Sequence, residues 1–181
     1  MAQNITSATS NLGFLTVLHE ASGFLGGYLV TNNWGRPLEF RLSTAVQPNR
    51  VQQILYGGTL KAYIYGDLIG KTLVDKTGTP AQFILTDCEP VLEMRLSLEV
   101  PVAWVASKHE FLESQLPVPK LAAAAPERGP VYCHSRFPND AAFIHESLSR
   151  LDRMIDLTEP FTRIRDAISE ARKMGIINKS H

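Results

Sequence analysis

Side chains able to do acid-base, nucleophilic or metal chemistry occur together in four short segments: His19-Glu20, Asp87-Cys88-Glu89, Cys133-His134 and His145-Glu146. Metal sites in proteins commonly show close ligand spacings such as C-x-x-C or H-E-x-x-H, and neither occurs here. The phosphate-binding and nucleophile motifs GxxxxGK[ST], GxGxxG and GxSxG are also absent. We therefore expect no metal and no cofactor.

Cys133 beside His134 suggests a thiol nucleophile with an imidazole base. Neighbouring residues on a strand point to opposite faces, so this pair would need a further partner from elsewhere. The enzyme hypothesis is a small hydrolase, with or without a metal, whose site is assembled from loops by Asp87, Cys133, His134 and His145. The structural interpretation is a core thiol beside a surface imidazole. We favour a non-catalytic chain and keep the hydrolase as the alternative.

Trp34 lies in a polar turn, Asn32 to Pro37, two residues before Arg36. Tryptophan and arginine are enriched at the centres of protein interfaces, so Trp34 and Arg36 are candidate partner-binding residues. The structural interpretation is a ring that folds back over the open end of the sheet.

The charges balance, with 18 basic and 18 acidic side chains in 181 residues. Together with 44% apolar residues this excludes a disordered chain, a collagen-like repeat and a disulfide scaffold. Nucleic-acid-binding surfaces are usually basic, so nucleic acid is possible as a partner but not favoured. Phosphate contact by Arg36, Arg41 and Arg50 would be the basis of that lesser alternative, a nucleic-acid accessory protein.

The N-terminal residues show no signal peptide, and no apolar run predicts a transmembrane span. Cys88 and Cys133 stand 45 positions apart without a second pair near either. We expect two reduced thiols, a cytoplasmic location and no membrane partner.

The elements that must position these side chains begin after a flexible N-terminus, residues 1–11. Residues 12–107 are expected to form an α+β core. Period-two alternation, clearest at Leu38, Phe40 and Leu42, predicts an antiparallel meander over residues 12–46.

Helices and further strands follow the meander. Asn49 is a plausible N-cap for a short helix that ends at Gly57-Gly58, and a second helix starts from Thr59. Gly66 and Gly70 within it would permit close packing on a neighbouring backbone. Strands are expected at residues 81–86, 91–98 and 100–106.

Residues 108–130, rich in proline and alanine, are predicted to be a connector. Residues 131–181 are predicted to form a strand and a helical hairpin that packs on the core or on a partner. The first helix starts near Pro138 and carries a narrow stripe of Ile144, Leu148, Leu151 and Ile155. The second, capped by Thr158, carries Phe161, Ile164 and Ile168 and ends at Gly175.

The predicted fold is α+β: an N-terminal antiparallel meander extended into a mixed sheet, with a C-terminal helical hairpin. The predicted function is that of a non-catalytic cytoplasmic subunit or adaptor. It assembles with itself or with a larger complex through its C-terminal helices and the Trp34 turn. Its predicted contact residues are Trp34, Arg36, Phe161, Ile164 and Ile168, although the last three could equally be core.

Overall fold

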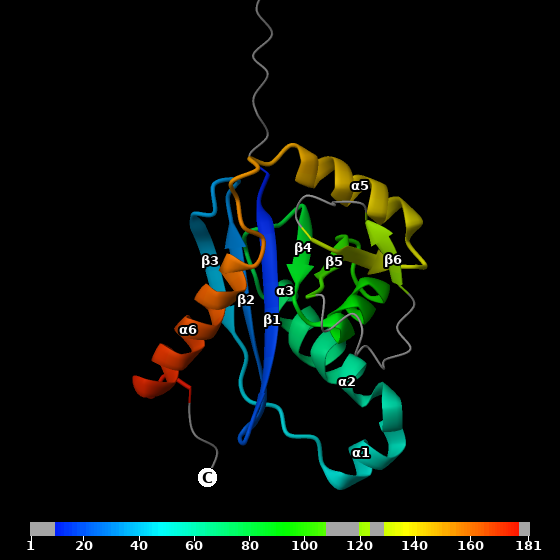
Figure 1. Cartoon of the computed structure of the whole chain (residues 1–181). Helices are drawn as coiled ribbons and strands as arrows, with labels where there is room; N and C mark the ends of the chain where they lie inside the picture. The colour runs from blue at the N-terminus through cyan, green and yellow to red at the C-terminus, as the bar shows by residue number, and fades with distance from the viewer. Residues whose placement is uncertain (1–9, 108–119, 124–128, 178–181) are drawn as a thin grey trace, which may run out of the picture.

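The computed structural model describes residues 10–107, 120–123 and 129–177. Its centre is a seven-stranded mixed sheet with the strand order β3-β2-β1-β4-β5-β7-β6, and helices complete the predicted α+β fold (Figure 1). The strands are β1 Leu12–Glu20, β2 Gly23–Thr31, β3 Pro37–Leu42, β4 Phe83–Thr86, β5 Val102–Val105, β6 Lys120–Ala123 and β7 Val131–His134. The helical segments are α1 Arg50–Tyr56, η1 Gly57–Thr59, α2 Leu60–Ala62, η2 Tyr63–Lys71, α3 Thr72–Asp75, η3 Glu89–Leu96, α5 Pro138–Ser149 and α6 Glu159–Lys173.

The first three strands form the predicted antiparallel meander. β1 pairs with β2 along its whole length, from Leu12 opposite Thr31 to Glu20 opposite Gly23. Gly23 has a φ of +112°, a conformation that glycine adopts without strain, and so permits the tight turn between them. β3 pairs with β2 and forms one edge of the sheet.

The other half of the sheet combines both pairing directions. β4 is parallel to β1 and to β5. The helical segments from α1 to α3 lead into β4, and η3 forms the crossover from β4 to β5. β7 is antiparallel to β5, and β6 is antiparallel to β7.

The strand β6 lies within residues 108–130, where we predicted a connector, so four residues of that segment belong to the sheet. Its residues extend the sheet by pairing with β7, although their alanine-rich sequence gives little strand signal. Residues 108–119 and 124–128 of that segment lie outside the described part, as do residues 1–9 of the predicted N-terminal segment.

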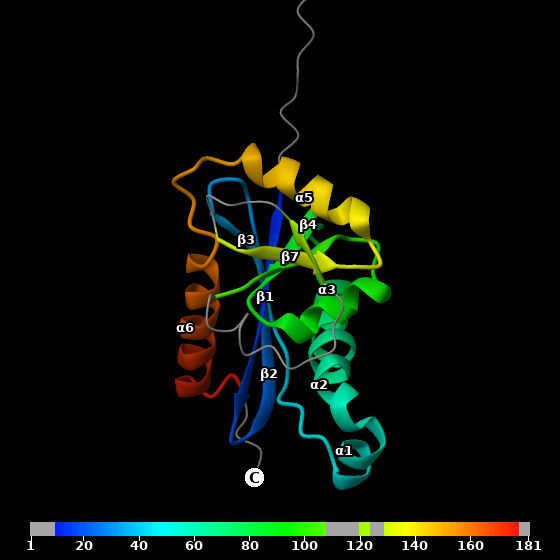
Figure 2. The ribbon, with the colours of Figure 1, turned by 45° about the vertical axis from the view of Figure 1, so that its right-hand side comes forward.

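One face of the sheet is covered by the π-helical segment η2, α3 and the 3-10 helix η3 (Figure 2). The two glycines of η2 allow the close approach that their spacing predicted. A Cβ on Gly66 would lie 3.1 Å from the backbone nitrogen of Met94, and one on Gly70 would lie 2.8 Å from its Sδ. Larger residues at these positions would push η2 away from η3.

The expected strand at residues 91–98 is wrong, because residues 91–96 belong to η3. Pro90 in the first turn favours a helical start, since its missing N–H is not needed there. Val91, Leu92 and Met94 are all fully buried, so the apparent alternation with polar residues did not mark a sheet face.

The opposite face is covered by α5 and α6, which occupy different halves of the sheet (Figure 2). α6 lies over β1 and β2, whereas α5 lies over β6 and β7. α5 ends at Ser149, so Leu151 and Ile155 belong to the connection between the helices. The two helices predicted as a hairpin therefore each pack on the sheet, where the apolar side of each helix is buried.

Candidate partner-binding cleft

Trp34 lies in the turn that joins β2 to β3, and its side chain is 79% exposed. The side-chain oxygen Oδ1 of Asn32 accepts hydrogen bonds from the backbone N–H groups of Trp34 and Arg36, both at 3.0 Å. Gly35 has a φ of +76° and donates its N–H to the carbonyl oxygen of Asn32. The turn is thus held by its own hydrogen bonds and presents the ring to solvent, which excludes the interpretation in which the ring covers the end of the sheet.

The Trp34 turn forms one side of a cleft of about 430 Å³. The cleft is also lined by Leu12 and Phe14 of β1, by the connection that follows α5, and by the first turn of α6. This volume lies within the range of small-ligand and side-chain pockets.

Met154 lines the same cleft from the connection between α5 and α6, and its side chain is 90% exposed. Its backbone N–H is held by a 2.9 Å hydrogen bond to Oδ1 of Asp152. Trp34 therefore supplies an exposed aromatic side chain to the cleft, and Met154 supplies an exposed, flexible apolar one.

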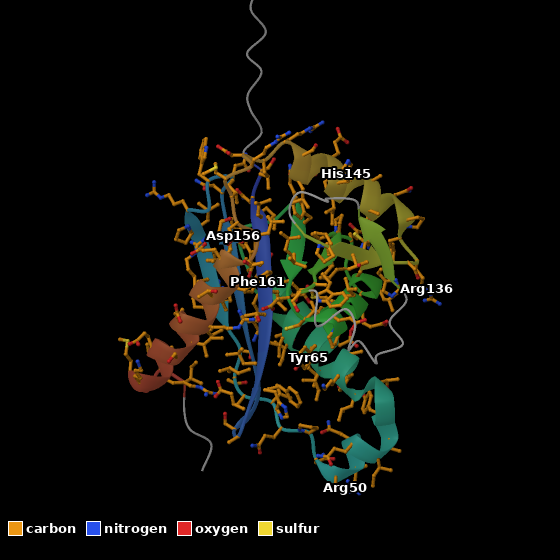
Figure 3. All side chains as sticks on the ribbon, viewed as in Figure 1. Arg50, Tyr65, Arg136, His145, Asp156 and Phe161 are labelled. Carbon is orange, nitrogen blue, oxygen red and sulfur yellow. The ribbon has the colours of Figure 1, made fainter. Side chains whose placement is uncertain are left out.

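The rim of the cleft is polar. Asp156 accepts hydrogen bonds from the backbone N–H and the hydroxyl of Thr158, at 2.8 and 2.7 Å, just before α6 begins (Figure 3). These bonds hold the pKa of the Asp156 carboxyl below its usual range. Glu159 pairs with Arg163 at 2.9 Å, and Arg163 also donates to the carbonyl oxygen of Gly35 at 2.9 Å. Two carboxylates and one guanidinium thus surround an apolar opening.

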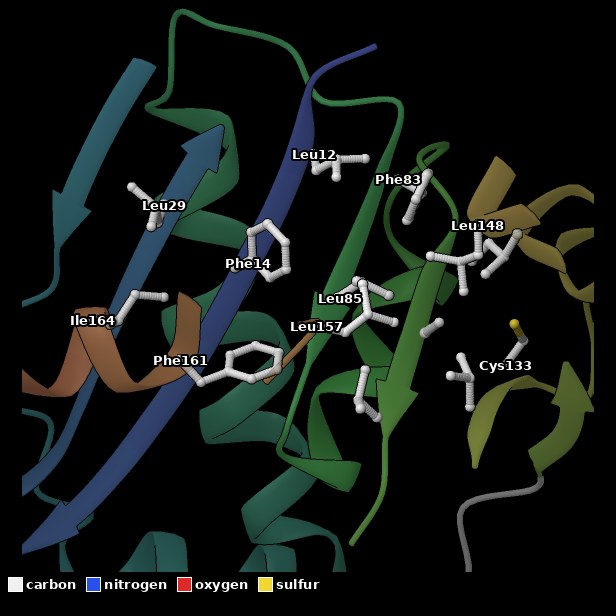
Figure 4. Packing of buried hydrophobic residues seen from close by; sticks show 14 of the residues in the cluster. Leu12, Phe14, Leu29, Phe83, Leu85, Cys133, Leu148, Leu157, Phe161 and Ile164 are labelled. Atoms are coloured by element: carbon white, nitrogen blue, oxygen red, sulfur yellow. The ribbon is translucent and has the colours of Figure 1, made fainter. Parts of the chain in front are cut away.

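Phe161, Ile164 and Ile168, which we predicted as possible contacts to a partner, are core residues. Each is only 1% exposed. The ring of Phe161 packs edge-on against Phe14 at a centroid distance of 5.8 Å (Figure 4). Ile164 and Ile168 lie so close to Gly27 of β2 that a Cβ there would collide with Ile164. The expectation that this stripe contacts a partner is corrected: it seals α6 onto the sheet.

The structure does not bring the proposed hydrolase residues together. Asp87, after β4, forms an ion pair with Arg165 of α6. Cys133 is fully buried in the core beneath α5, and burial raises the pKa of its thiol to about 12. His145 is exposed on α5 (Figure 3). Within the described ranges, no three His, Cys, Asp or Glu side chains form a group that could hold a metal ion.

His134 is buried rather than a surface imidazole. It is 2% exposed, and its Nδ1 accepts the backbone N–H of Arg136 at 3.2 Å. Its Nε2 lies 3.5 Å from Glu93 of η3, on the other side of the sheet from the core that contains Cys133. The neighbours therefore point in opposite directions, as the strand geometry required, and cannot act as a nucleophile and base pair.

The three arginines considered for phosphate contact lie on separate elements. Arg36 is exposed in the Trp34 turn but does not line the cleft, and Arg41 on β3 pairs with Glu39 at 2.8 Å. Arg50 begins α1, which lies at the end of the molecule away from that turn (Figure 3). This arrangement gives no support to a continuous basic surface.

The sequence-based reasoning missed Met154 and Asp156 as cleft residues. Asp156 had a signal, since an Asp two residues before a predicted N-cap can form an Asx turn. No sequence signal marked Met154. Its side chain is exposed because α5 already ends at Ser149, which leaves Met154 in the connection to α6. The sequence also predicted α1 without showing that Val51, Ile54 and Leu55 would be 63%, 64% and 78% exposed.

Neither a protein-family model nor a curated protein matches this chain. Among the described helices, none combines the length and the apolar composition that crossing a bilayer requires.

Proposed function

We propose that this chain is a non-catalytic cytoplasmic subunit or adaptor that binds a partner protein at the cleft beside Trp34. One observation carries the proposal: Trp34, 79% exposed, is held in a hydrogen-bonded turn at the edge of a 430 Å³ cleft that Met154 also lines. A rigid aromatic side chain in a fixed turn loses little entropy on binding, which is why tryptophan is frequent among energetically dominant interface residues.

The chemistry of the cleft indicates what the partner offers. Trp34 and Met154 suit an apolar or aromatic side chain inserted between them. Asp156 and Glu159 on the rim outnumber Arg163, so a lysine or arginine beside that side chain would find a carboxylate. The expected partner segment therefore combines one large apolar residue with a neighbouring basic residue.

The contribution of the C-terminal helices differs from the one the sequence suggested. The N-terminal part of α6 lines the cleft through Glu159 and Arg163, while its apolar stripe holds the helix on the sheet. Cys88 and Cys133 form no disulfide with each other, which suits the proposed reducing compartment.

Affinity capture followed by measurement with the purified partner tests the proposal. The tagged chain and its Trp34→Ala variant are compared in extracts of the native host, and the retained protein is then titrated against each. We expect a stoichiometric partner whose Kd rises about tenfold or more in Trp34→Ala, as for interface residues worth at least 1.4 kcal/mol.

Met174→Ala is the matched control, because Met174 is 72% exposed but lies beyond the end of α6, outside the cleft. It should bind like the unmodified chain. If no stoichiometric partner is retained, or if Trp34→Ala binds it as tightly as the control, the proposal is wrong.

A further inference from the structure

We infer that a pocket beside α3 binds a small neutral molecule that has an apolar body and one oxygen atom, which accepts a hydrogen bond from Tyr28. The pocket has a volume of about 160 Å³ and lies between the sheet and the connection from α3 to β4. It is on the face of the sheet opposite α6 (Figure 2). Because it shares no lining residue with the Trp34 cleft, this inference and the proposed function can fail independently.

The walls of the pocket are mainly apolar and come from separate parts of the chain. They include one residue of α3, two of the connection that follows it, one of β4 and one shortly before β5: Val74, Pro80, Ala81, Ile84 and Val100. A dry apolar cavity of about 150 Å³ is large enough to bind benzene. The walls therefore suit a ring of about six atoms, and a few polar groups would fix its orientation.

Tyr28 of β2 brings its hydroxyl to this pocket. A Cβ on Gly13 of β1 would lie 2.5 Å from the Tyr28 hydroxyl oxygen and 3.1 Å from Cγ1 of Ile84, so the hydroxyl lies beside a wall of the pocket. The Tyr28 side chain is only 2% exposed, and its hydroxyl forms no hydrogen bond with any group in residues 10–107, 120–123 or 129–177. Buried hydroxyls almost always have a hydrogen-bond partner, so a polar atom of a bound molecule would complete this one.

The other two polar side chains of the pocket already have partners. The Thr77 hydroxyl donates to the carbonyl oxygen of Leu73 at 2.8 Å. The Thr79 side chain bonds to the carboxylate of Glu39. Burial and the nearby charge of Glu39 raise the pKa of Tyr28, so its hydroxyl keeps its proton at neutral pH. Tyr28 is therefore the side-chain donor that remains for the oxygen of a ketone, an aldehyde or an ether.

The charge of Glu39 favours a neutral ligand. Its carboxylate accepts the N–H groups of Gly78 and Thr79 and the guanidinium of Arg41, and these bonds lower its pKa to about 2. The carboxylate is therefore ionised at neutral pH and would repel an anion placed beside Tyr28. Its oxygens are already bonded within the chain, so a cation in the apolar pocket would lose its hydration without gaining a free carboxylate.

The connection that forms the outer wall is held in place on both sides of the pocket. Glu39 holds its beginning through the bonds just described. Further along, the side-chain amide of Asn11 donates to the carbonyl oxygen of Pro80 at 3.1 Å, and the backbone N–H of Gln82 donates to the carbonyl oxygen of Asn11 at 2.9 Å. The pocket is therefore formed by the fold itself, which lowers the entropic cost of binding.

Titration with cyclohexanone tests the inference, because this ring carries one acceptor oxygen and no charge. The full chain is titrated while its backbone amide resonances are followed by NMR. We expect saturable binding with a Kd of about 1 mM or lower, as for a ligand of seven non-hydrogen atoms. The amides of Thr79, Ala81 and Ile84, which line the pocket, should shift.

Tyr28→Phe tests the hydrogen bond, since it removes the hydroxyl and keeps the ring. The Kd for cyclohexanone should rise about three- to tenfold, the usual effect of one hydrogen bond. Cyclohexene, a ring of similar size without an oxygen, should bind both proteins equally. Tyr56→Phe is the matched control, because it removes a hydroxyl from α1, outside the pocket, and should leave both affinities unchanged.

The inference is wrong if cyclohexanone at a tenfold excess over the expected Kd shifts none of the three amides, since the pocket then holds water only. Equal affinity of Tyr28→Phe and Tyr56→Phe for cyclohexanone would also overturn it. So would an equal loss of cyclohexanone and cyclohexene binding in Tyr28→Phe, because the hydroxyl would then shape the pocket and not bond the ligand.

Discussion

The guanidinium of Arg163 on α6 donates a 2.9 Å hydrogen bond to the backbone carbonyl oxygen of Gly35, 128 residues earlier in the chain. The same side chain pairs with Glu159. This contact joins the Trp34 turn to a helix whose inner side is sealed in the core. The two sides of the cleft are therefore held in a fixed relationship, which would lower the entropic cost of binding the proposed partner.

Arg163→Ala should weaken partner binding without unfolding the protein. Its side chain is 34% exposed, so we expect the free energy of unfolding to change by less than about 1 kcal/mol. The Kd for the partner should rise roughly three- to tenfold, because the turn loses its tie to α6. Calorimetric titration and urea denaturation measure the two quantities. Arg150→Ala, which removes a similar ion pair on α5, is the control, and equal affinity of both variants would contradict the role of Arg163.

Ile164→Ala tests the assignment of the α6 stripe to the core. Removal of this 1% exposed side chain should lower the free energy of unfolding by about 2 to 5 kcal/mol through lost burial and a residual cavity. Ile176→Ala, at a side chain that is 67% exposed, should change it by less than about 0.5 kcal/mol. Denaturant unfolding measures both. If the two variants are similarly stable, the stripe of Phe161, Ile164 and Ile168 is not core and would again be a candidate interface.

Gly27→Ala should destabilise the protein by overpacking the contact between β2 and α6. The added Cβ would collide with Cγ2 of Ile164 and lie 3.3 Å from Cδ1 of Ile168. We expect a loss of about 1 to 3 kcal/mol. In the double variant Gly27→Ala/Ile164→Ala the collision is removed, so the total loss should be smaller than the sum of the single losses. Additive losses would show that the two residues are not in contact.

Alkaline pH should destabilise the protein through its buried thiol. Burial, with a smaller contribution from the charge of Asp140, raises the pKa of Cys133 to about 12 from an ordinary 9.0. Between these values the unfolded chain has released this proton and the folded chain has not, so stability falls as pH rises above about 9. Burial also raises the pKa of Tyr65 to about 12, which acts in the same direction.

Denaturation at pH 8 and pH 10 measures this effect. Cys133→Ala should lose less stability between the two conditions than the unmodified chain, because Tyr65 remains and the thiol does not. The half-buried Cys88 is left unchanged in both proteins as an internal control. Equal losses would show that the Cys133 thiol titrates normally in the folded state.

Much of the fold could be predicted because helix caps, turns and strand alternation each depend on only a few neighbouring residues. Asn49 forms the capping box with Gln52, Pro160 lies in the first turn of α6, and Gly175 follows that helix with a φ of +72°. Thr158 occupies the N-cap position of α6, but its hydroxyl donates to Asp156 and does not cap the helix. The meander followed from alternation for the same reason. η3 was missed because a 3-10 helix in which Val91, Leu92 and Met94 are buried can imitate alternation, and β6 because its strand forms through pairing with β7.

The candidate site was predicted less completely, because it depends on which elements meet. The turn around Trp34 was compatible with a protruding ring or with a ring folded over the end of the sheet, and the structure shows the protruding ring. The stripe at Phe161 looked the same whether it faced a sheet or a partner, since periodicity defines a side of a helix and not what covers it. Only the placement of α6 over β1 and β2 decides between them.

Fluorine NMR of the protein labelled with 5-fluorotryptophan tests the central claim most directly, because the chain has two tryptophans, one 79% and one 1% exposed. Trp34→Phe assigns the resonances of Trp34 and the buried Trp104. On saturation with the captured partner, the resonance of Trp34 should shift or broaden while that of Trp104 stays in place. Stoichiometric binding that leaves the Trp34 resonance unchanged would contradict the account.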